Sequence, residues 1–357
     1  MKIAVFTRWN ATCGISLHAE LIVREWVRKG YDVRVFAPTI ESASTDWHHR
    51  VLEIKDEPWV IRCYEETDDP KGGYIDFEKI LEHDFDIFVV EAYARQPVEK
   101  LKELIGRVKR RAKTVAIIHG FRREHTDPFA LMDFDAYVVF DNRYIEELLK
   151  PFLDRIGDRI HIIPYPCAPP LNVRPHRPGF AEGKILFFSF GRQPPEEYRD
   201  YFEALRRLRS SYDLVYWIIR SDGLLDVNEK WVKQWWMRPP LEILYRYLKA
   251  SDIHLLPKGR SRYVVVSSTV YQTLGALVPI VTPNTRYVET IPTDENGIGV
   301  VVKYNDLEDL IGKLKLLIED AETRVRVIRE AHRFVEKNSA EKIADEYLEL
   351  FRSLLSS

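Results

Sequence analysis

The feature that most constrains the fold is a regular alternation of short apolar runs with longer amphipathic segments. Residues 2–7 form a β-rich run, residues 15–29 carry apolar side chains at helical spacing, and residues 33–36 form a second apolar run. A strand, a helix and a strand in this order make a βαβ unit, and such units build parallel sheets. The alternation resumes after a polar, irregular stretch at residues 41–80 and continues to residue 163. The first half of the chain is therefore predicted to be an α/β domain.

Residues 164–183 interrupt this pattern with six prolines and little periodicity, which is typical of a linker. Beyond them, apolar runs and helical segments alternate again as far as a helical tail. A chain of 357 residues is also too long for one ordinary domain. We therefore expect two α/β domains, divided into residues 1–165, a linker at 166–183, a second domain at 184–338 and a final helix at 339–357.

Composition argues against several classes of protein. A net charge of −2 disfavours a general nucleic-acid binder, which normally carries a strong positive charge. Cys13, Cys63 and Cys167 are far apart and lack the spacing of a zinc site or a disulfide framework, which favours a reducing compartment. We expect no signal peptide, because the chain opens directly on a strand, and no apolar run has the length of a membrane span. A cytoplasmic protein is predicted, and its 30% of charged residues is typical of thermophilic proteins.

One stretch, residues 255–282, combines the features of an anion site. It reads as a buried strand, a basic turn, a short helix and another buried strand. In open α/β sheets, ligands lie beyond the carboxyl ends of strands, where backbone N–H groups of the following helix also attract anions. A solvated basic turn with a serine cap explains the same residues equally well. The cations and hydroxyls concerned are Lys258, Arg260, Arg262, Ser267, Ser268 and Thr269.

Short motifs along the chain resemble those of one enzyme family. In order they are Gly30-Tyr-Asp-Val-Arg-Val-Phe36, Ile118-His-Gly120, Ile162-Ile-Pro-Tyr-Pro166, Phe190-Gly-Arg192, residues 244–253, Gly275-Ala-Leu-Val-Pro279 and Asn296-Gly297. Each is loose, but the series covers nearly the whole chain in the right order. It resembles the retaining, nucleotide-sugar-dependent glycosyltransferases of family 4, also called group 1.

The resemblance implies the GT-B fold, in which two Rossmann-like α/β/α domains face each other across a deep cleft. It also implies transfer of a hexose from a nucleoside diphosphate sugar, such as a GDP- or UDP-sugar, to an acceptor hydroxyl with retention of configuration. The first domain would bind the acceptor and the second the donor. No metal or other cofactor would be required, and the final helix would pack back on the first domain.

On the donor side, the resemblance makes Arg192 the principal group that stabilises the leaving diphosphate, with Lys258 and Arg260 as support. A surface salt bridge is the alternative for each. The backbone N–H of Gly14 could meet a phosphate, although a tight turn also explains this glycine. Trp236 could stack on the base; packing in the core better explains its neighbours Trp231 and Trp235. Arg238, Ser267, Ser268, Thr269 and Gln272 complete the predicted donor-binding set.

Three residues of the first half are candidates, one for catalysis (His119) and two on the acceptor side (His18 and Glu91). His119 follows a buried strand and matches the family's sugar-contacting histidine, whereas a hydrogen-bonded histidine at a strand end is the alternative. His18, one turn into the first helix, could line the same surface or be structural. Glu91 ends a strand and could orient the acceptor, or simply cap a helix.

The sequence departs from the family at functional positions. The family's two glutamates are replaced by Val264, which cannot contact a sugar hydroxyl, and Gln272, which can still bond to a ribose diol. The lysine that normally follows the Gly-Arg motif is absent, and Arg199, Lys258 or Arg260 could supply its charge. These losses suggest, as an alternative, an inactive GT-B homologue that binds a nucleotide or glycan or serves as a partner subunit.

A nucleotide-sugar epimerase or a phosphorylase is a further alternative with the same fold.

Other expectations concern the partners of a transferase. The acceptor could be a glycan, a lipid-linked molecule or a small molecule. The only dense basic run, residues 107–113, could touch the inner face of a membrane, but it also suits a solvated helix end.

Overall fold

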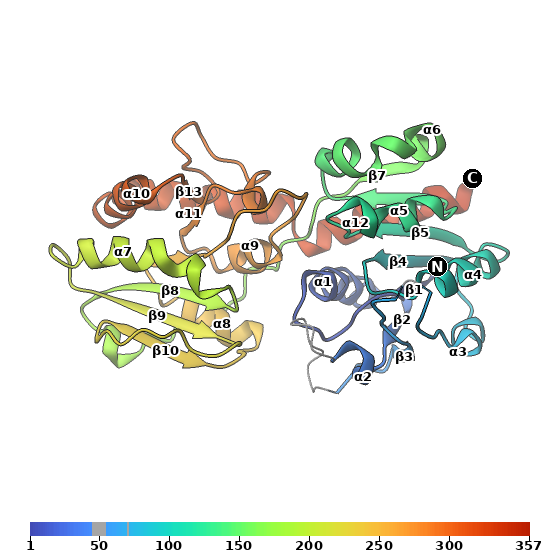
Figure 1. The fold of residues 1–357 in the computed structure, drawn as a ribbon, viewed down its shortest axis with the longest axis horizontal. Helices are drawn as coiled ribbons and strands as arrows, with labels where there is room; N and C mark the ends of the chain where they lie inside the picture. Colours follow the sequence, from blue (N-terminus) through green and yellow to red (C-terminus); the bar gives the residue numbers. More distant parts are fainter. Residues whose placement is uncertain (45–54, 70) are drawn as a thin grey trace. The chain divides into compact units, whose positions relative to one another are not determined.

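The computed structural model describes residues 1–44, 55–69 and 71–357 (Figure 1). They form two compact units, each with its own sheet. Unit 1 comprises Met1–Pro166, Tyr263–Ser268 and Asn338–Ser357. Unit 2 comprises Cys167–Arg262 and Thr269–Lys337. The stretch that the sequence singled out is thus shared, because its middle belongs to unit 1 and its ends to unit 2.

The sheet of unit 1 has seven parallel strands in the order β3-β2-β1-β4-β5-β6-β7. The chain runs outward from β1 in one direction and then restarts at β4 in the other. The gap between the carboxyl ends of β1 and β4 is therefore the switch point, where such sheets bind ligands. The strands are β1 (Lys2–Phe6), β2 (Asp32–Pro38), β3 (Val60–Tyr64), β4 (Ile87–Ala92), β5 (Lys113–Ile118), β6 (Ala136–Val139) and β7 (Ile160–Ile162).

The first helix of unit 1 shows how the sequence sets its boundaries. The α1 helix (Gly14–Arg28) begins after Cys13, whose sulfur accepts a hydrogen bond from the Ser16 N–H. It ends before Gly30, whose φ of +85° is a conformation that favours glycine. The other helices of this unit are α2 (Ile40–Ala43), α3 (Phe77–Leu81), α4 (Val98–Val108), α5 (Arg123–Leu131), a π-helix (Tyr144–Leu149), α6 (Leu153–Ile156) and α12 (Ala340–Ser356).

The C-terminal helix α12 packs against α1, although more than 300 residues separate them in sequence. Trp26 of α1 lies edge-on to Tyr347 and Phe351 of α12. Its indole N–H donates a hydrogen bond of 3.0 Å to the carbonyl of Ala344. All three aromatic side chains are buried, so this contact fixes the last helix to unit 1.

Replacing Trp26 by phenylalanine should lower the free energy of unfolding by about 1–2 kcal/mol, because a buried hydrogen bond and part of the ring volume are lost. Urea unfolding measures the change. Trp236→Phe is the matched control, since Trp236 is 70% exposed and its loss should have little effect on stability. Equal changes in the two variants would contradict the role given to Trp26.

Unit 2 repeats the design with six parallel strands in the order β10-β9-β8-β11-β12-β13. Its switch point lies between β8 and β11. The strands are β8 (Ile185–Gly191), β9 (Leu214–Arg220), β10 (Val232–Trp236), β11 (Ile253–Leu255), β12 (Ile280–Pro283) and β13 (Val302–Tyr304). The helices are α7 (Arg199–Leu208), α8 (Leu241–Leu248), α9 (Ser268–Thr273), α10 (Leu307–Glu319) and α11 (Ala321–Lys337), with short 3-10 turns.

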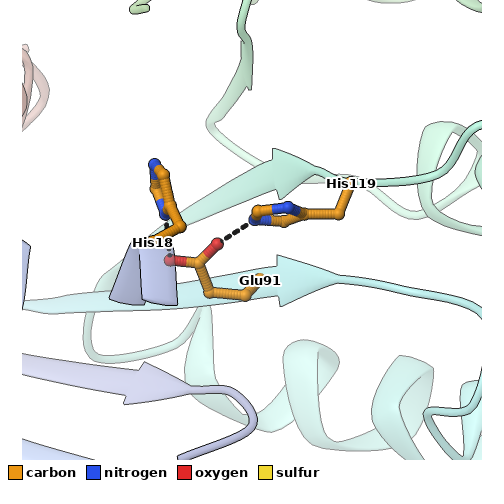
Figure 2. A group of neighbouring side chains, drawn as sticks. All are labelled: His18, Glu91 and His119. Carbon is orange, nitrogen blue, oxygen red and sulfur yellow. Dashed lines mark hydrogen bonds and ion pairs between the residues drawn. The ribbon is translucent and has the colours of Figure 1, made fainter. Parts of the chain in front are cut away.

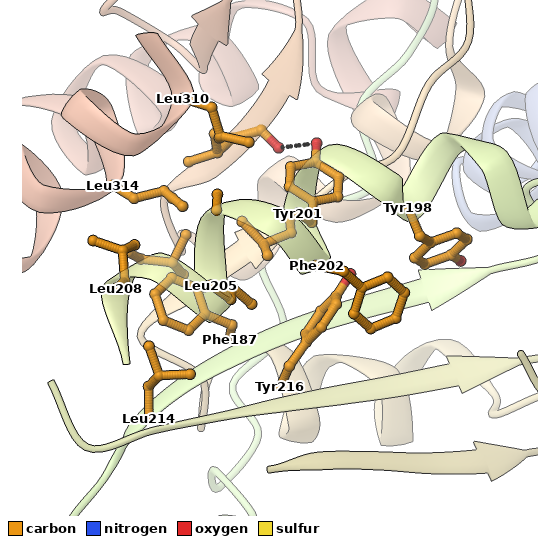
Figure 3. Packing of buried hydrophobic residues seen from close by; sticks show 14 of the residues in the cluster. Phe187, Tyr198, Tyr201, Phe202, Leu205, Leu208, Leu214, Tyr216, Leu310 and Leu314 are labelled. Carbon is orange, nitrogen blue, oxygen red and sulfur yellow. Dashed lines mark hydrogen bonds between the residues drawn. The ribbon is translucent and has the colours of Figure 1, made fainter. Parts of the chain in front are cut away.

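One face of this sheet packs against α7 and α10 (Figure 3). Phe187 and Tyr216 project from the strands toward Leu205 of α7, and Leu310 and Leu314 of α10 close the cluster. All five side chains are fully buried. This core fixes the position of α7 on the sheet, and it thereby positions the loop that joins β8 to α7.

The proline-rich segment after Pro166 is tied to unit 2 by backbone contacts. Arg177 donates to the carbonyls of Ala250 and Lys184, and Lys249 donates to the carbonyl of Leu171. The segment therefore has few regular elements but many fixed hydrogen bonds.

The structure adds elements that the pattern did not predict. Residues 41–80 were expected to be irregular, which is wrong for β3 and α3; residues 45–54 and 70 lie outside the described residues. The α5 helix was also missed, because Pro128 lies inside it. An apolar run at residues 299–302 predicts the last strand of unit 2, but that strand begins at Val302.

Candidate functional site

Two of the predicted cations lie at the switch point of unit 2. Arg192 directly follows β8, and Lys258 follows β11, so the adjacent strands that flank the switch point deliver both. They are close enough for the charge of Arg192 to lower the pKa of Lys258. Anion-binding groups of α/β sheets are found at this location, and unit 2 places both cations there without help from unit 1.

The loop that carries Arg192 is held rigidly. Gly191 has a φ of +135°, and a β-carbon there would lie 2.5 Å from the side chain of Gln193. Arg220, at the end of β9, donates to the carbonyl of Gln193 at 2.6 Å. Tyr198 donates to the side-chain oxygen of the same glutamine. Because both neighbours of Gln193 are buried, the backbone beside Arg192 is set before any ligand binds.

Lys258 is partly buried, and burial lowers its pKa to about 8. The value of about 8 already includes the charge of Glu197, which raises this pKa, and the charge of Arg192, which lowers it. The Nζ atom of Lys258 also lies 5.2 Å from the centre of the Tyr287 ring, within the range of a cation–π contact. The group is therefore a cation that titrates close to physiological pH.

Glu197 is an acidic neighbour that the sequence did not point to. Its carboxylate accepts a hydrogen bond from the backbone N–H of Gly259, and a β-carbon on that glycine would lie 2.4 Å from the carboxylate. Burial raises the pKa of Glu197. Tyr287, which lies just beyond β12, was likewise not predicted from the sequence. Both follow the carboxyl ends of strands, and that position was the signal available in the sequence.

The remaining predicted donor residues of unit 2 are more dispersed. Arg199 begins α7 with 83% of its side chain exposed and lies 3.8 Å from Asp200. Trp236 ends β10, where its N–H donates to the carbonyl of Ser221, and Arg238 lies 3.7 Å from Asp222. These two therefore flank the loop after β9. Of the others, Arg260 is exposed, Thr269 and Gln272 are partly buried, and the carbonyls of Thr269 and Gln272 accept hydrogen bonds from Thr273 and Tyr245.

In unit 1, the start of α1 meets the segment Tyr263–Ser268. A β-carbon on Gly14 would lie 3.1 Å from the β-carbon of Ser268, so glycine permits this close approach. Tyr165 donates to the Gly14 carbonyl at 2.6 Å. Ser267 and Val264, both in the same segment, are buried. Unit 1 thus brings together Gly14 and Ser268, two of the predicted donor residues, at a helix N-terminus.

The catalytic candidate His119 and the two acceptor-side candidates form one cluster beside the switch point of unit 1 (Figure 2). Glu91, in β4, is fully buried with one oxygen toward each histidine. His18 of α1 lies with Nδ1 2.8 Å from one carboxylate oxygen, and Nε2 of His119 makes a short hydrogen bond to the other. The two histidines lower the pKa of Glu91 to about 2, against the opposing effect of burial.

Exposure separates the members of this cluster. His18 and Glu91 have no exposed side-chain surface, whereas His119 keeps 6% of its own. Within this cluster, therefore, only His119 is placed to touch a substrate directly, and the other two act through it. The walls are aromatic, with Phe140, Tyr165 and Tyr347 against the ring of His18.

The same three side chains are the group, among the described residues, that could hold a metal ion. They offer two ring nitrogens and a carboxylate oxygen within 4.8 Å of one another. Each ring nitrogen faces a different oxygen of Glu91, which is the geometry of two hydrogen bonds (Figure 2). Hydrogen bonding therefore explains the arrangement without a ligand.

A second buried polar cluster near this edge was not predicted. Arg8, just after β1, forms a fully buried ion pair with Glu66, at 2.5 Å. The hydroxyl of Tyr93 donates a hydrogen bond of 2.7 Å to the same carboxylate, and a hydrogen bond of 2.8 Å joins it to the hydroxyl of Tyr64. Buried charges require such partners, so this cluster fixes the loops after β1, β3 and β4.

A pocket at the opposite edge of unit 2 contains none of the predicted residues. It lies at the amino ends of β8 and β9, away from the carboxyl edge where Arg192 and Lys258 are found. Its lining consists of Lys184, Arg209, Ser211, Tyr212, Asp213, Leu214, Lys230 and Trp231.

Comparison with known proteins identifies the fold. No family model matches the chain. A glycosyltransferase from Rickettsia africae is similar over 99% of this chain and 98% of its own, with 15% identity and a TM-score of 0.65. A UDP-forming α,α-trehalose-phosphate synthase from Burkholderia xenovorans matches over the full length of both chains, with 12% identity and a TM-score of 0.68. The catalytic domain of starch synthase IV from Arabidopsis thaliana, bound to ADP and acarbose, matches equally fully with 11% identity and a TM-score of 0.67.

These similarities extend over both units and agree with the two parallel sheets described above. At such low identity they establish the architecture, and the chemistry must be argued from the residues of this chain. The chain has the α/β architecture of the GT-B fold.

Proposed function

We propose that this protein is a glycosyltransferase that moves a hexose from a nucleoside diphosphate sugar to an acceptor hydroxyl with retention of configuration. The observation that carries the proposal is the pair of Arg192 and Lys258 after the two strands at the switch point of unit 2. A transferase of this kind needs positive charge beside the leaving diphosphate, which becomes more negative as its bond to the sugar breaks. The GT-B architecture, shared with glycosyltransferases over the full chain, is consistent with this chemistry.

In this reaction Arg192 and Lys258 bind the diphosphate and stabilise it as the bond to the sugar breaks. The arginine offers a planar set of donors, which suits bidentate contact with phosphate oxygens, and the lysine acts as a point charge. Lys258 would replace the lysine that the sequence lacks after its Gly-Arg motif. Arg260 and Arg199 are exposed on the same side and could add attraction at longer range.

The other donor contacts follow from position. Trp236 has 70% of its surface exposed and could stack on the base, with Arg238 beside it. Gln272 would bond to the ribose, and Ser267, Ser268, Thr269 and the Gly14 N–H to phosphate oxygens. UDP- and GDP-sugars are the first candidate donors. We propose that neither a metal ion nor another cofactor takes part.

Unit 1 would bind the acceptor, with Glu91 and His18 on that side, and His119 would act in catalysis by contacting a hydroxyl of the sugar. The acceptor is a glycan, a lipid-linked molecule or a small molecule. None of the helices in the described ranges is long and apolar enough to cross a membrane. We propose a cytoplasmic enzyme, which could reach a lipid-linked acceptor through peripheral contact with the inner face of the membrane.

Lys258 makes donor binding depend on pH. Below a pKa of about 8 the amine is charged and binds the diphosphate fully, and above it the charge is lost. A bound diphosphate raises this pKa, so affinity should fall by up to about tenfold per pH unit between the two values. Calorimetric titration with UDP or GDP from pH 7 to 10 measures the decline. Lys258→Arg stays charged and should abolish it; identical profiles for both proteins would contradict the assignment.

Two observations favour a second candidate, an inactive homologue that binds a nucleotide or glycan. Glu197 places a carboxylate against Gly259 and Lys258, where a phosphate would otherwise lie, and Val264 is buried instead of polar. Such a protein would bind nucleoside diphosphates without turning over the sugar. A nucleotide-sugar epimerase would instead convert the nucleotide sugar to its epimer in the absence of any acceptor.

Product analysis distinguishes these functions. The protein is incubated with UDP-, GDP-, ADP- and dTDP-glucose together with mono- and disaccharide or lipid acceptors, and released nucleoside diphosphate is quantified. Release that depends on an acceptor, with an α-linked product seen by proton NMR, supports a retaining transferase. Nucleotide binding without release would support the inactive homologue, and an inverted product would overturn the proposed stereochemistry.

A further inference from the structure

The cluster of His18, Glu91 and His119 has a hydrogen-bond pattern that determines which nitrogen of His119 faces outward. We propose that Glu91 holds His119 as the tautomer protonated on Nε2, so that Nδ1 presents a lone pair to a sugar hydroxyl. His18 and Tyr347 act as positioning residues that hold Glu91 in place. This inference rests on the proposed function only for the identity of its ligand, a sugar hydroxyl.

The pattern starts from the protonation of Glu91. Its side chain is fully buried, and its two histidine neighbours keep the pKa of the carboxyl near 2. At neutral pH the group is therefore an ionised carboxylate, which can only accept hydrogen bonds. Each ring nitrogen that faces it must carry a proton. Those nitrogens are Nδ1 of His18 and Nε2 of His119.

The proton on Nε2 determines the state of the other nitrogen of His119. Burial lowers the pKa of this imidazole, and Glu91 only partly offsets the effect, so the ring is neutral at neutral pH. A neutral imidazole has one N–H and one lone pair, and the lone pair is then on Nδ1. Within the described ranges, Nδ1 has no hydrogen-bond partner, and His119 is the member of the cluster with exposed surface. The available polar atom of the ring is therefore an acceptor, suited to a hydroxyl.

His18 keeps the carboxylate from turning away. Its Nδ1 donates to Glu91 whichever charge it carries, and its Nε2 lies 3.4 Å from the hydroxyl of Tyr347. Tyr347 is on α12, and both side chains are fully buried. The ring of His18 also packs against Phe140 and Tyr165. The last helix of the chain, α12, is therefore linked to His119 through two intermediate side chains, those of His18 and Glu91.

The backbone holds the other end. The N–H of His119 donates 3.0 Å to the carbonyl of Ala92, which continues the ladder between β4 and β5. Phe140 lies edge-on against the His119 ring at 5.0 Å. Rotation of the imidazole would break its bond to Glu91 and this packing together, so both the ring orientation and the tautomer are set before a ligand binds.

Nitrogen NMR tests the tautomer without any need for activity. The full-length protein is labelled with ¹⁵N-histidine, and long-range correlation spectra at pH 7.5 report which ring nitrogens are protonated. The His119 signals are assigned by their loss in His119→Gln, with His161→Gln as the control, because His161 lies on β7 outside the cluster. We expect an unprotonated Nδ1 and a protonated Nε2. A protonated Nδ1, in either the other tautomer or the imidazolium, would overturn the inference, as would stoichiometric zinc bound by these histidines.

Glu91→Gln provides the second arm. The two rings face different oxygens of Glu91, and in glutamine one of these positions becomes an NH2 group, which donates. The ring nitrogen that faces the NH2 group can no longer donate to it, so the signals of His119 or His18 should change to the other tautomer. Glu91→Asp, which keeps the carboxylate, should restore the wild-type pattern at least in part. Unchanged spectra in Glu91→Gln would show that Glu91 does not set the tautomer.

The ligand is tested by adding UDP-, GDP- and ADP-glucose to the wild-type protein. A shift of the His119 Nδ1 signal that is larger than the shift caused by the matching nucleoside diphosphate alone supports contact with a sugar hydroxyl. No shift with any of the three would overturn that contact. If the tautomer is as expected but the protein releases no nucleotide in the product assay, the proposed function fails and the tautomer assignment stands.

Discussion

Replacing Arg192 by alanine should lower the turnover number about 100- to 1,000-fold, the usual cost of removing one group that stabilises developing charge. The leaving diphosphate would lose its principal cation, and Lys258 alone would remain to offset the charge that develops on it. The melting temperature should hardly change, because Arg192 lies in a loop that Gln193, Arg220 and Tyr198 fix independently.

Steady-state kinetics with the identified donor, together with thermal unfolding, measures both effects. Arg206→Ala is the matched control, because this exposed arginine of α7 pairs with Glu229 and has no part in the proposed site. It should leave turnover unchanged. A large loss of stability in Arg192→Ala would make Arg192 structural, and unchanged turnover would show that Arg192 takes no part in the reaction.

Replacing Glu91 by leucine should lower the free energy of unfolding by about 3–5 kcal/mol, the typical cost of breaking a buried charge cluster by removing one partner. The N–H groups of His18 and His119 would lose their acceptor where almost no water can reach them. The stability difference between the wild-type protein and Glu91→Leu should also decrease at low pH. The folded-state pKa of Glu91, about 2, is lower than in the unfolded chain, so its stabilisation is full above about pH 5 and is lost as the pH falls toward 2.

Urea unfolding at pH 7 and at pH 4 tests this expectation. The control is Glu103→Ala, since Glu103 is an exposed residue of α4 whose pair with Arg107 should contribute less than about 1 kcal/mol. A change for Glu91→Leu no larger than that of the control would show that the cluster contributes little to stability.

The sequence predicted most of the architecture because the main signals are local. Apolar runs such as residues 87–90 and helical periodicity such as residues 15–29 place β4 and α1 without tertiary information. The β3 strand was missed because Val60–Tyr64 follows a long polar stretch and acquires its strand character by pairing with β2. The α5 helix was missed because a proline in its interior argues against a helix, and surrounding contacts override that preference.

The candidate site was predictable where position along a strand determines it. Arg192 and Lys258 follow the ends of apolar runs, so the sequence could place both at the carboxyl edge of one sheet. It could not show that Glu197 turns toward Gly259, because that contact depends on the path of a loop. Nor could it show that Tyr347 lies behind His18, since 329 residues separate the two.

The central claim is that unit 2 binds a nucleoside diphosphate through Arg192 and Lys258. The most direct measurement is thermal unfolding with UDP, GDP, ADP and dTDP and their common sugars, each with and without magnesium. The account predicts a clear rise in melting temperature for one base, since a ligand at 100 times its Kd adds about 2.7 kcal/mol of stability. Arg192→Ala should lose most of that rise. No rise with any nucleotide, or a rise that Arg192→Ala retains in full, would contradict the account.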